Sequence, residues 1–427
     1  MRLYILCSIF LLFGISLQAQ SEVISPAADQ TMPIVITGVT AHLGNGRVIE
    51  NAAVAFEKGK ITWVGKASSW KGTDDHQMIV AKGKHLYPGL IAANTTLGLE
   101  EISAVRATVD SREVGAFNPN VRSLIAYNTD SEVIPTLRTN GVLTAQICPR
   151  GGWIPGSSSV VHLDAWNWED AVLKVGDGIH VNWPRSYSYN WRLGQRSAND
   201  KYNDQVAALR DFFTQAQAYS NTEEVLEKNL KFEAMRSVFN KQSKCYIRAN
   251  EVVEMQDLIY FAKDFDLDLV IIGGQESWRI TDLLVEQGVP VVLGQVHALP
   301  ANTDSDIDQP FKTPAMLQDA GVLFCISIDD FWQVRNLAFQ AGHTVGFGMD
   351  KEDALRAVTS SAAEIMGLGE ELGQIKVGYR ATLFISEGDA LDYVGNSISR
   401  IFIDGRDVSL QNKQKALYEK FKTKYQK

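Results

Sequence analysis

Residues 251–327 alternate helical and strand-like segments, which read EVVEMQDLIYFAKDF (251–265), LDLVII (267–272), ITDLLVEQ (280–287), VPVVL (289–293), TPAMLQDA (313–320) and VLFCIS (322–327). The amphipathic segments predict helices, and the short apolar runs predict buried strands. Helices and strands that alternate at this spacing predict βα units and a parallel sheet. A pattern of about 280 residues favours a closed (β/α)8-type barrel over an open sheet.

The same alternation begins earlier in the chain. We expect strands at 87–93 and 141–148, and a helix at 132–140 that stops at Gly141, a residue suited to a left-handed turn. The Gly- and Ser-rich segment 151–159 predicts a loop near the barrel mouth, although backbone N–H groups there could bind a substrate. Two charge-rich amphipathic segments, 204–219 and 223–240, predict a helical insertion at about 190–244.

Both ends of the chain carry β patterns. Residues 34–64 alternate around turns at Gly44-Asn-Gly46 and Lys58-Gly59, and 381–385 and 398–405 show a similar pattern. We therefore expect one discontinuous β-sandwich built from 20–87 and 374–410, which flanks a distorted barrel at 88–373. The Lys-rich tail 411–427 predicts a solvated surface helix, with a membrane-surface or anionic-partner role as the alternative.

The chain begins with features of an export signal. Arg2 precedes an apolar run from Leu3 to Leu17, and Ala19 offers a cleavage point, so residues 1–19 are expected to be a signal peptide. The alternative is an uncleaved anchor, but the run is shorter than the ~20 residues that a spanning helix needs. No later segment is long and apolar enough to span a membrane. We expect a periplasmic or extracellular protein.

The net charge and the cysteines exclude some classes of function and of covalent cross-link. The net charge of −9 argues against general nucleic-acid binding. Cleavage would leave Cys148, Cys245 and Cys325, which are widely spaced and lie in or beside apolar stretches. We expect buried thiols rather than a disulfide framework, with one bridge left open.

An ordered set of motifs resembles the amidohydrolase superfamily, and most closely its imidazolonepropionase-like group. Tyr87-Pro-Gly-Leu-Ile91 resembles the family's first barrel strand, residues 352–368 its last helix, and Gly373 to Leu383 the strand that re-enters the sandwich. Further matches are Asn140-Gly-Val-Leu-Thr144, Gly273-Gly-Gln-Glu276, Arg335-Asn-Leu337 with Ala341-Gly342, and Ile403-Asp-Gly405-Arg. The resemblance covers most of the chain after residue 19 and implies a hydrolase with one or two divalent metals at the barrel mouth.

The chain departs from that family's metal ligands at nearly every position. The family's His-x-His falls on Asn94-Thr95-Thr96. Its next histidine falls on Arg248-Ala249-Asn250, with Asn250 as the best match, and the following one on Gly273. Only the final aspartate has a candidate, Asp329 or Asp330. Amide and hydroxyl groups are weak zinc ligands, and one carboxylate cannot replace three protein ligands. We expect no bound metal unless unforeseen ligands converge, such as His180 and His297 with Asp329 or Asp330.

The resemblance and the substituted metal-ligand positions together leave two candidate functions. The first is an exported hydrolase that acts on non-peptide or dipeptide C–N bonds, with Asp329 as its candidate catalytic residue. The second is an inactive family member that binds a ligand or partners an intact amidohydrolase. The expected partners are accordingly a small amide or peptide ligand, a second copy of the chain, or an amidohydrolase subunit.

Overall fold

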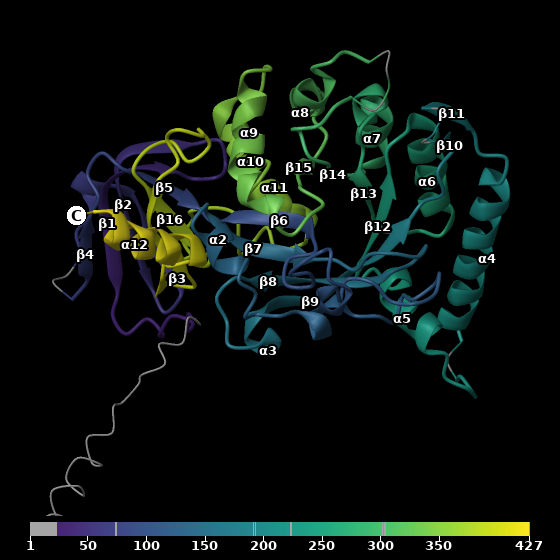
Figure 1. Cartoon of the computed structure of the whole chain (residues 1–427), viewed down its shortest axis with the longest axis horizontal. Coiled ribbons are helices and arrows are strands. Elements are labelled where there is room, and N and C mark those ends of the chain that lie inside the picture. The colour runs from purple at the N-terminus through teal and green to yellow at the C-terminus, as the bar shows by residue number, and fades with distance from the viewer. Residues whose placement is uncertain are drawn as a thin grey trace, which may run out of the picture.

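The computed structural model describes residues 24–426 apart from 73–74, 191, 193, 223, 301 and 303–304. The expected signal peptide, residues 1–19, lies outside the described residues. Figure 1 shows two bodies side by side: a barrel with helices around it, and a sheet built from early and late strands of the chain. No helix among the described residues is long and apolar enough to cross a membrane.

Eight strands form the barrel, as the alternating sequence predicted. They are β6 (Leu90–Thr95), β7 (Val142–Ile147), β8 (Gly156–His162), β9 (Val172–Asn182), β12 (Lys244–Ala249), β13 (Leu269–Gly273), β14 (Val291–Leu293) and β15 (Phe324–Ile326). They pair in chain order from β6 to β15. Residues 357–358 bridge the two edge strands, because the Ile326 N–H donates to Ala357 O and the Ile91 N–H donates to Val358 O, both at 2.9 Å. The barrel is therefore nearly closed.

One barrel strand corrects the sequence prediction. Residues 151–159 were expected to form a loop, but β8 begins at Gly156 and runs antiparallel to both β7 and β9. Gly and Ser are poor strand formers, so composition hid this strand. Its residues are all buried, which shows that tertiary packing overrides the local preference.

The helices lie around the outside of the barrel (Figure 1). They are α2 (Ile134–Arg138), α3 (Trp168–Ala171), α4 (Tyr202–Ser220), α5 (Leu230–Phe239), α6 (Val252–Asp264), α7 (Thr281–Gln287), α8 (Gln309–Ala320), α9 (Leu337–Val345) and α10 (Lys351–Arg356). A capping box of Glu251 and Glu254 begins α6. The helical pair α4–α5 lies between β9 and β12, where a barrel crossover is needed, and a hairpin of β10 (Tyr187–Asn190) and β11 (Gln195–Ala198) precedes it.

A short helix, α11 (Ser360–Ile365), closes the amino-terminal end of the barrel. Its Ala362, Ala363 and Ile365 pack with Ile91, Val270, Val292 and Cys325, which lie near the starts of their strands. This apolar cluster forms the floor of the barrel. The strands finish at the opposite end. Functional side chains of parallel barrels gather at that carboxyl end.

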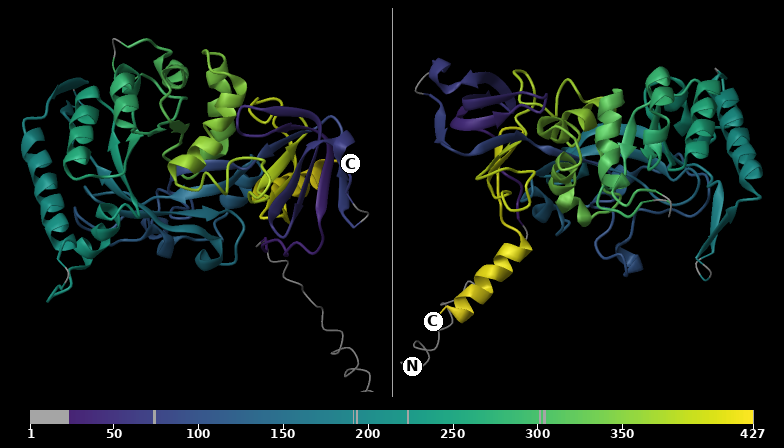
Figure 2. Two further views of the ribbon diagram at one scale, coloured as in Figure 1. Left: turned by 180° about the vertical axis from the view of Figure 1, so that it is seen from behind. Right: turned by 90° about the horizontal axis from the view of Figure 1, so that it is seen from above.

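The second sheet joins the two ends of the chain. Its strands are β1 (Ile34–His42), β2 (Val48–Glu57), β3 (Lys60–Lys66), β4 (Gln77–Val80), β5 (His85–Pro88), β16 (Leu383–Ser386), β17 (Ile398–Ile403) and β18 (Arg406–Val408). The antiparallel pair of β5 and β16 connects the early strands to the late ones. We call this body the terminal sheet. Helix α12 (Lys413–Tyr425) follows it and projects beyond the rest of the chain in the right-hand view of Figure 2.

Candidate functional site

The residues that match family ligand positions lie at the carboxyl ends of four parallel strands. Asn94 and Thr96 lie at the end of β6, Asn250 follows β12, Gly273 ends β13 and Asp329 follows β15. Asn250 and Gly273 are neighbours, since a Cβ atom added to Gly273 would lie 2.4 Å from Asn250 Oδ1. Gly273 has a φ of +97°, which an L-residue with a side chain rarely adopts. A histidine could not simply replace this glycine.

Two arginines hold the Asp329 carboxylate. Arg150 Nη2 pairs with Oδ1, and Arg248 Nη1 lies 2.7 Å from Oδ2. Arg248 Nη2 also donates to Asn94 Oδ1 at 3.2 Å, and Arg150 Nη2 donates to the Asn94 carbonyl oxygen at 2.8 Å. Asn94 and Asp329 are thus joined through guanidinium groups, and we call these four residues the arginine cluster.

The arginine cluster continues into a buried polar network inside the barrel. Gln146 Oε1 accepts the Asn94 N–H at 3.0 Å, and Gln146 Nε2 donates to Asp177 Oδ2 at 2.6 Å. Lys174 Nζ lies 3.5 Å from Asp177 Oδ1. Burial raises the pKa of the Asp177 carboxyl, which Lys174 and the Gln146 hydrogen bond oppose. The floor of the mouth is therefore polar and internally hydrogen-bonded.

The other predicted mouth residues have separate surroundings. His180, on β9, stacks on Tyr246 at 5.0 Å, and its pKa lies well below the ordinary value because of burial and the charges of Arg150 and Arg248. Asp330 Oδ1 instead accepts the N–H groups of Trp332 and Gln333, so its side chain caps a turn.

His297 is directed to a different contact. Its Nε2 atom lies 2.9 Å from Nδ1 of His343, on α9. Burial and the neighbouring His343 lower the pKa of His297. The structure does not place His297 in the arginine cluster.

Arg150 was not predicted as a site residue, and Arg248 was named only as part of the segment Arg248-Ala249-Asn250. Arg248 precedes Asn250 by two residues, so the period of a strand would place both side chains on the same face. Arg150 follows β7 after Pro149 and directly precedes the segment 151–159 that was interpreted as a loop. Their functional signal is visible only after folding brings them to Asp329.

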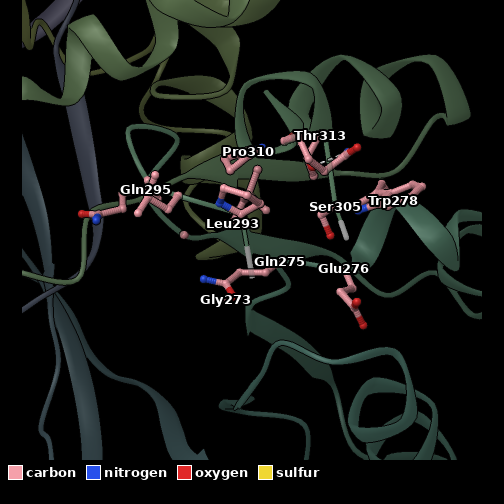
Figure 3. A pocket seen from close by; sticks show the side chains of 14 residues that line it. Gly273, Gln275, Glu276, Trp278, Leu293, Gln295, Ser305, Pro310 and Thr313 are labelled. Carbon is pink, nitrogen blue, oxygen red and sulfur yellow. Dashed lines mark hydrogen bonds between the residues drawn. The ribbon is translucent and has the colours of Figure 1, made fainter. Parts of the chain in front are cut away.

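A small pocket adjoins the mouth at the ends of β13 and β14 (Figure 3). Gly273 and Leu293 form its base, and Trp278, Leu299 and Pro310 supply apolar walls. Gln275, Gln295 and Thr313 add neutral polar groups. The pocket also contains the Glu276 carboxylate, which pairs with Arg279 at 3.2 Å. Such a mixture suits a ligand with both apolar and amide groups.

The donor set of the mouth does not suit a divalent metal. A catalytic zinc is usually held by three protein ligands, with histidine nitrogens and carboxylate oxygens among them. Here both Asp329 oxygens are paired with guanidinium groups, which would repel an added cation. No group of three or more His, Cys, Asp or Glu side chains that could hold a metal occurs within the described part of the chain.

Comparisons with known proteins agree with this architecture. Residues 283–412 match the model of the amidohydrolase family. The amidohydrolase tasK of Hapsidospora irregularis is 20% identical over 399 residues, which cover 82% of this chain but 39% of that protein. This chain therefore spans about two fifths of the curated relative that it matches.

Solved structures show the same fold. An amidohydrolase from Thermotoga maritima MSB8 has a TM-score of 0.77 and 24% identity, over 88% of this chain and 99% of that one. An adenosine deaminase from Xanthomonas campestris with bound zinc has a TM-score of 0.54 and 15% identity, over 91% and 97%. The fold is thus that of the amidohydrolase barrels.

Proposed function

We propose that this protein binds a small amide or peptide ligand at the barrel mouth without the metal-dependent hydrolysis of the amidohydrolases. The observation that carries the proposal is the pairing of both Asp329 oxygens with Arg150 and Arg248. The two guanidinium groups supply the positive charge that a metal would otherwise supply at this position. Unlike a metal, they cannot carry a water molecule as a nucleophile.

The neighbouring pocket supports the ligand class. Amide side chains of Gln275 and Gln295 can donate to a carbonyl oxygen and accept from an N–H group. Trp278 and Leu299 offer apolar surface beside them. A dipeptide or a cyclic amide presents both kinds of group to such a pocket.

Metal analysis combined with an activity assay tests the proposal. We expect the purified protein to hold less than one equivalent of zinc, and to gain no turnover of dipeptides or cyclic amides from added zinc, manganese or cobalt. Calorimetric titration with the same panel should detect binding in the presence of a chelator. The Trp278→Ala variant should weaken binding, whereas Trp63→Ala, in the terminal sheet, should not.

The opposite result is equally clear. Stoichiometric metal together with turnover that disappears in Asp329→Ala would overturn the proposal. The matched control is Asp266→Ala, which removes a carboxylate with an 89% exposed side chain that lies outside the mouth. Loss of activity in both variants would indicate a general effect of lost charge.

A second candidate function is metal-independent hydrolysis, favoured by His180. Among the described residues its buried Nε2 atom has no hydrogen-bond partner and is free to accept a proton, although burial, Arg150 and Arg248 hold its pKa well below the ordinary value and weaken it as a base. His180 would accept a proton from water as the water attacks the amide carbonyl, and the arginines would stabilise the oxyanion. The proton would then pass to the amine as the C–N bond breaks. Turnover in chelator that His180→Gln abolishes would select this candidate.

Other aspects of the function stay predictions. The imidazolonepropionase-like subgroup, export after removal of residues 1–19, and assembly with a second copy or an intact amidohydrolase all rest on the sequence. Intact-mass measurement of protein recovered from its native source would test the cleavage point.

A further inference from the structure

Helix α12 carries an apolar stripe that the rest of the described chain leaves exposed. Leu417, Phe421 and Tyr425 recur every four residues, and Tyr418 lies beside them on the same face. The exposed fraction is 43% for Leu417, 48% for Phe421, 71% for Tyr425 and 61% for Tyr418. No residue of α12 is buried, so the packing of this molecule does not require the stripe to be apolar.

Lysines border the stripe on both sides. Lys413, Lys420 and Lys424 follow one edge at intervals of seven and four residues, while Lys415 and Lys422, seven residues apart, follow the other. Long lysine side chains beside apolar residues can extend their charged ends toward anionic groups while their stems cover apolar surface. Lysines beside an exposed apolar face allow a helix to lie against an anionic surface, because the charged ends and the apolar side chains can contact it together.

The helix is anchored at its first turn. Asn412 caps it and donates from Nδ2 to Thr139 Oγ1 at 3.2 Å, and Thr136 Oγ1 donates to Gln414 Oε1 at 2.8 Å. Lys413 pairs with Glu132 at 2.5 Å. The later turns project from the body in the right-hand view of Figure 2. Leu417 lines a hollow between α12 and α2, so a flat surface reaches mainly Tyr418, Phe421 and Tyr425.

The charge of the molecule indicates what covers the stripe. The whole chain has a net charge of −9, yet α12 contains five lysines and a single glutamate. An acidic body is repelled by an anionic surface, so contact with such a surface requires a basic element like this helix. Lysines on both edges of the stripe can contact a plane of headgroup phosphates at the same time.

We propose that α12 docks lengthwise on an anionic phospholipid surface. Tyr418, Phe421 and Tyr425 enter the boundary between headgroups and acyl chains. Lys415, Lys420, Lys422 and Lys424 contact the phosphates, while Lys413 stays paired with Glu132. Tyr418 and Tyr425 suit this boundary because each has an apolar ring and a polar hydroxyl. The interaction is independent of the barrel mouth and of the function proposed for it.

Vesicle co-sedimentation of the full chain tests the proposal. The apolar run Leu3–Leu17 would also bind lipid, so the readout is the difference between phosphatidylcholine vesicles with and without phosphatidylglycerol. We expect tighter binding to the charged vesicles, weakened by salt. Tyr418→Ser with Phe421→Ser should weaken this charge-dependent binding at least ten-fold, as should Lys420→Gln with Lys422→Gln and Lys424→Gln.

A matched control removes the same number of lysines elsewhere. Lys71→Gln with Lys228→Gln and Lys231→Gln, at exposed positions outside α12, should retain the binding of the original chain. Equal binding to charged and neutral vesicles would overturn the proposal, and so would an equal loss in the control variant. Sedimentation velocity supplies a further outcome: a dimer that the α12 variants abolish would assign the stripe to a second copy and overturn the lipid assignment.

Discussion

Asp164 is one buried carboxylate that holds three distant parts of the chain together. Its side chain is 1% exposed, and it lies 2.6 Å from Arg138 Nη1 and 3.0 Å from Arg406 Nη1. It also accepts the Ala27 N–H at 3.0 Å. The carboxylate thus joins α2, the end of the terminal sheet and the first described residues.

We predict that Asp164→Asn lowers the free energy of unfolding by about 3 kcal/mol, because two buried guanidinium groups lose their counter-ion. The matched control is Asp266→Asn, whose carboxylate pairs with Lys241 at 2.7 Å but has an 89% exposed side chain. That exposed pair should contribute about 1 kcal/mol or less. Urea denaturation of the two variants measures the difference, and equal effects would contradict the structural role of Asp164.

His180 should make the free energy of unfolding depend on pH. Its folded pKa is lowered by burial and by Arg150 and Arg248, whereas in the unfolded chain it takes up a proton near pH 6.5. The unfolded state therefore binds more protons below that pH, and the free energy of unfolding should fall as the pH drops. Above about pH 6.5 both states hold the same neutral imidazole, so this contribution to the pH dependence vanishes.

We predict that His180→Phe removes up to about 1.4 kcal/mol per pH unit from the slope below pH 6.5. His85, His162 and His297 also have lowered pKa values and should retain a shallower slope. Urea denaturation at several pH values measures both slopes. An unchanged slope in the variant would show that His180 is accessible to protons in the folded state.

At the scale of elements, α11 packs against the starts of the barrel strands and closes the barrel floor. Ile365 is 1% exposed within the interior cluster. We predict that Ile365→Ala costs about 3 kcal/mol through lost burial and a residual cavity. Ile102→Ala, at a residue 55% exposed, is the control and should change stability by about 0.5 kcal/mol or less. Thermal and urea unfolding would both detect the difference.

The sequence predicted most elements because their signals are local. Residue Gly141 illustrates this: its φ of +86° fits a helix stop, and an added Cβ would lie 2.8 Å from the Phe384 ring. Strand β8 was missed because its Gly and Ser residues owe their extended conformation to two antiparallel neighbours. The arginine cluster was missed for the same reason: Arg150, Arg248 and Asp329 meet only across three separate strand ends.

The cysteines also show that local sequence predicts burial but not which residues come together. Their apolar sequence surroundings predicted buried thiols, and Cys148, Cys245 and Cys325 are all free and buried. Burial raises the pKa of the Cys148 and Cys325 thiols to about 12. Pairing would have required knowledge of distances between strands, which the sequence alone does not supply.

At the scale of the whole molecule, the chain passes directly from the terminal sheet into the barrel at Gly89. Strand β5 ends at Pro88 and β6 begins at Leu90, so Gly89 alone separates the two bodies. The Gly89 N–H donates to Thr382 O, beside the terminal sheet, and the Leu90 N–H donates to Gly141 O, before β7, both at 2.9 Å. Loss of either body would break hydrogen bonds that position the other.

We therefore predict that the two bodies unfold together. Trp63 and Trp70 lie in or beside the terminal sheet, and the other tryptophans of the chain lie between residues 153 and 332. The difference in fluorescence between the original chain and Trp63→Phe with Trp70→Phe reports the terminal sheet, while the variant alone reports the barrel. Both signals should have the same urea midpoint as the far-ultraviolet circular dichroism, because coincident probes indicate one cooperative transition. An earlier midpoint for Trp63 and Trp70 would show instead that the terminal sheet separates and unfolds first, and that the Gly89 junction does not couple the two bodies.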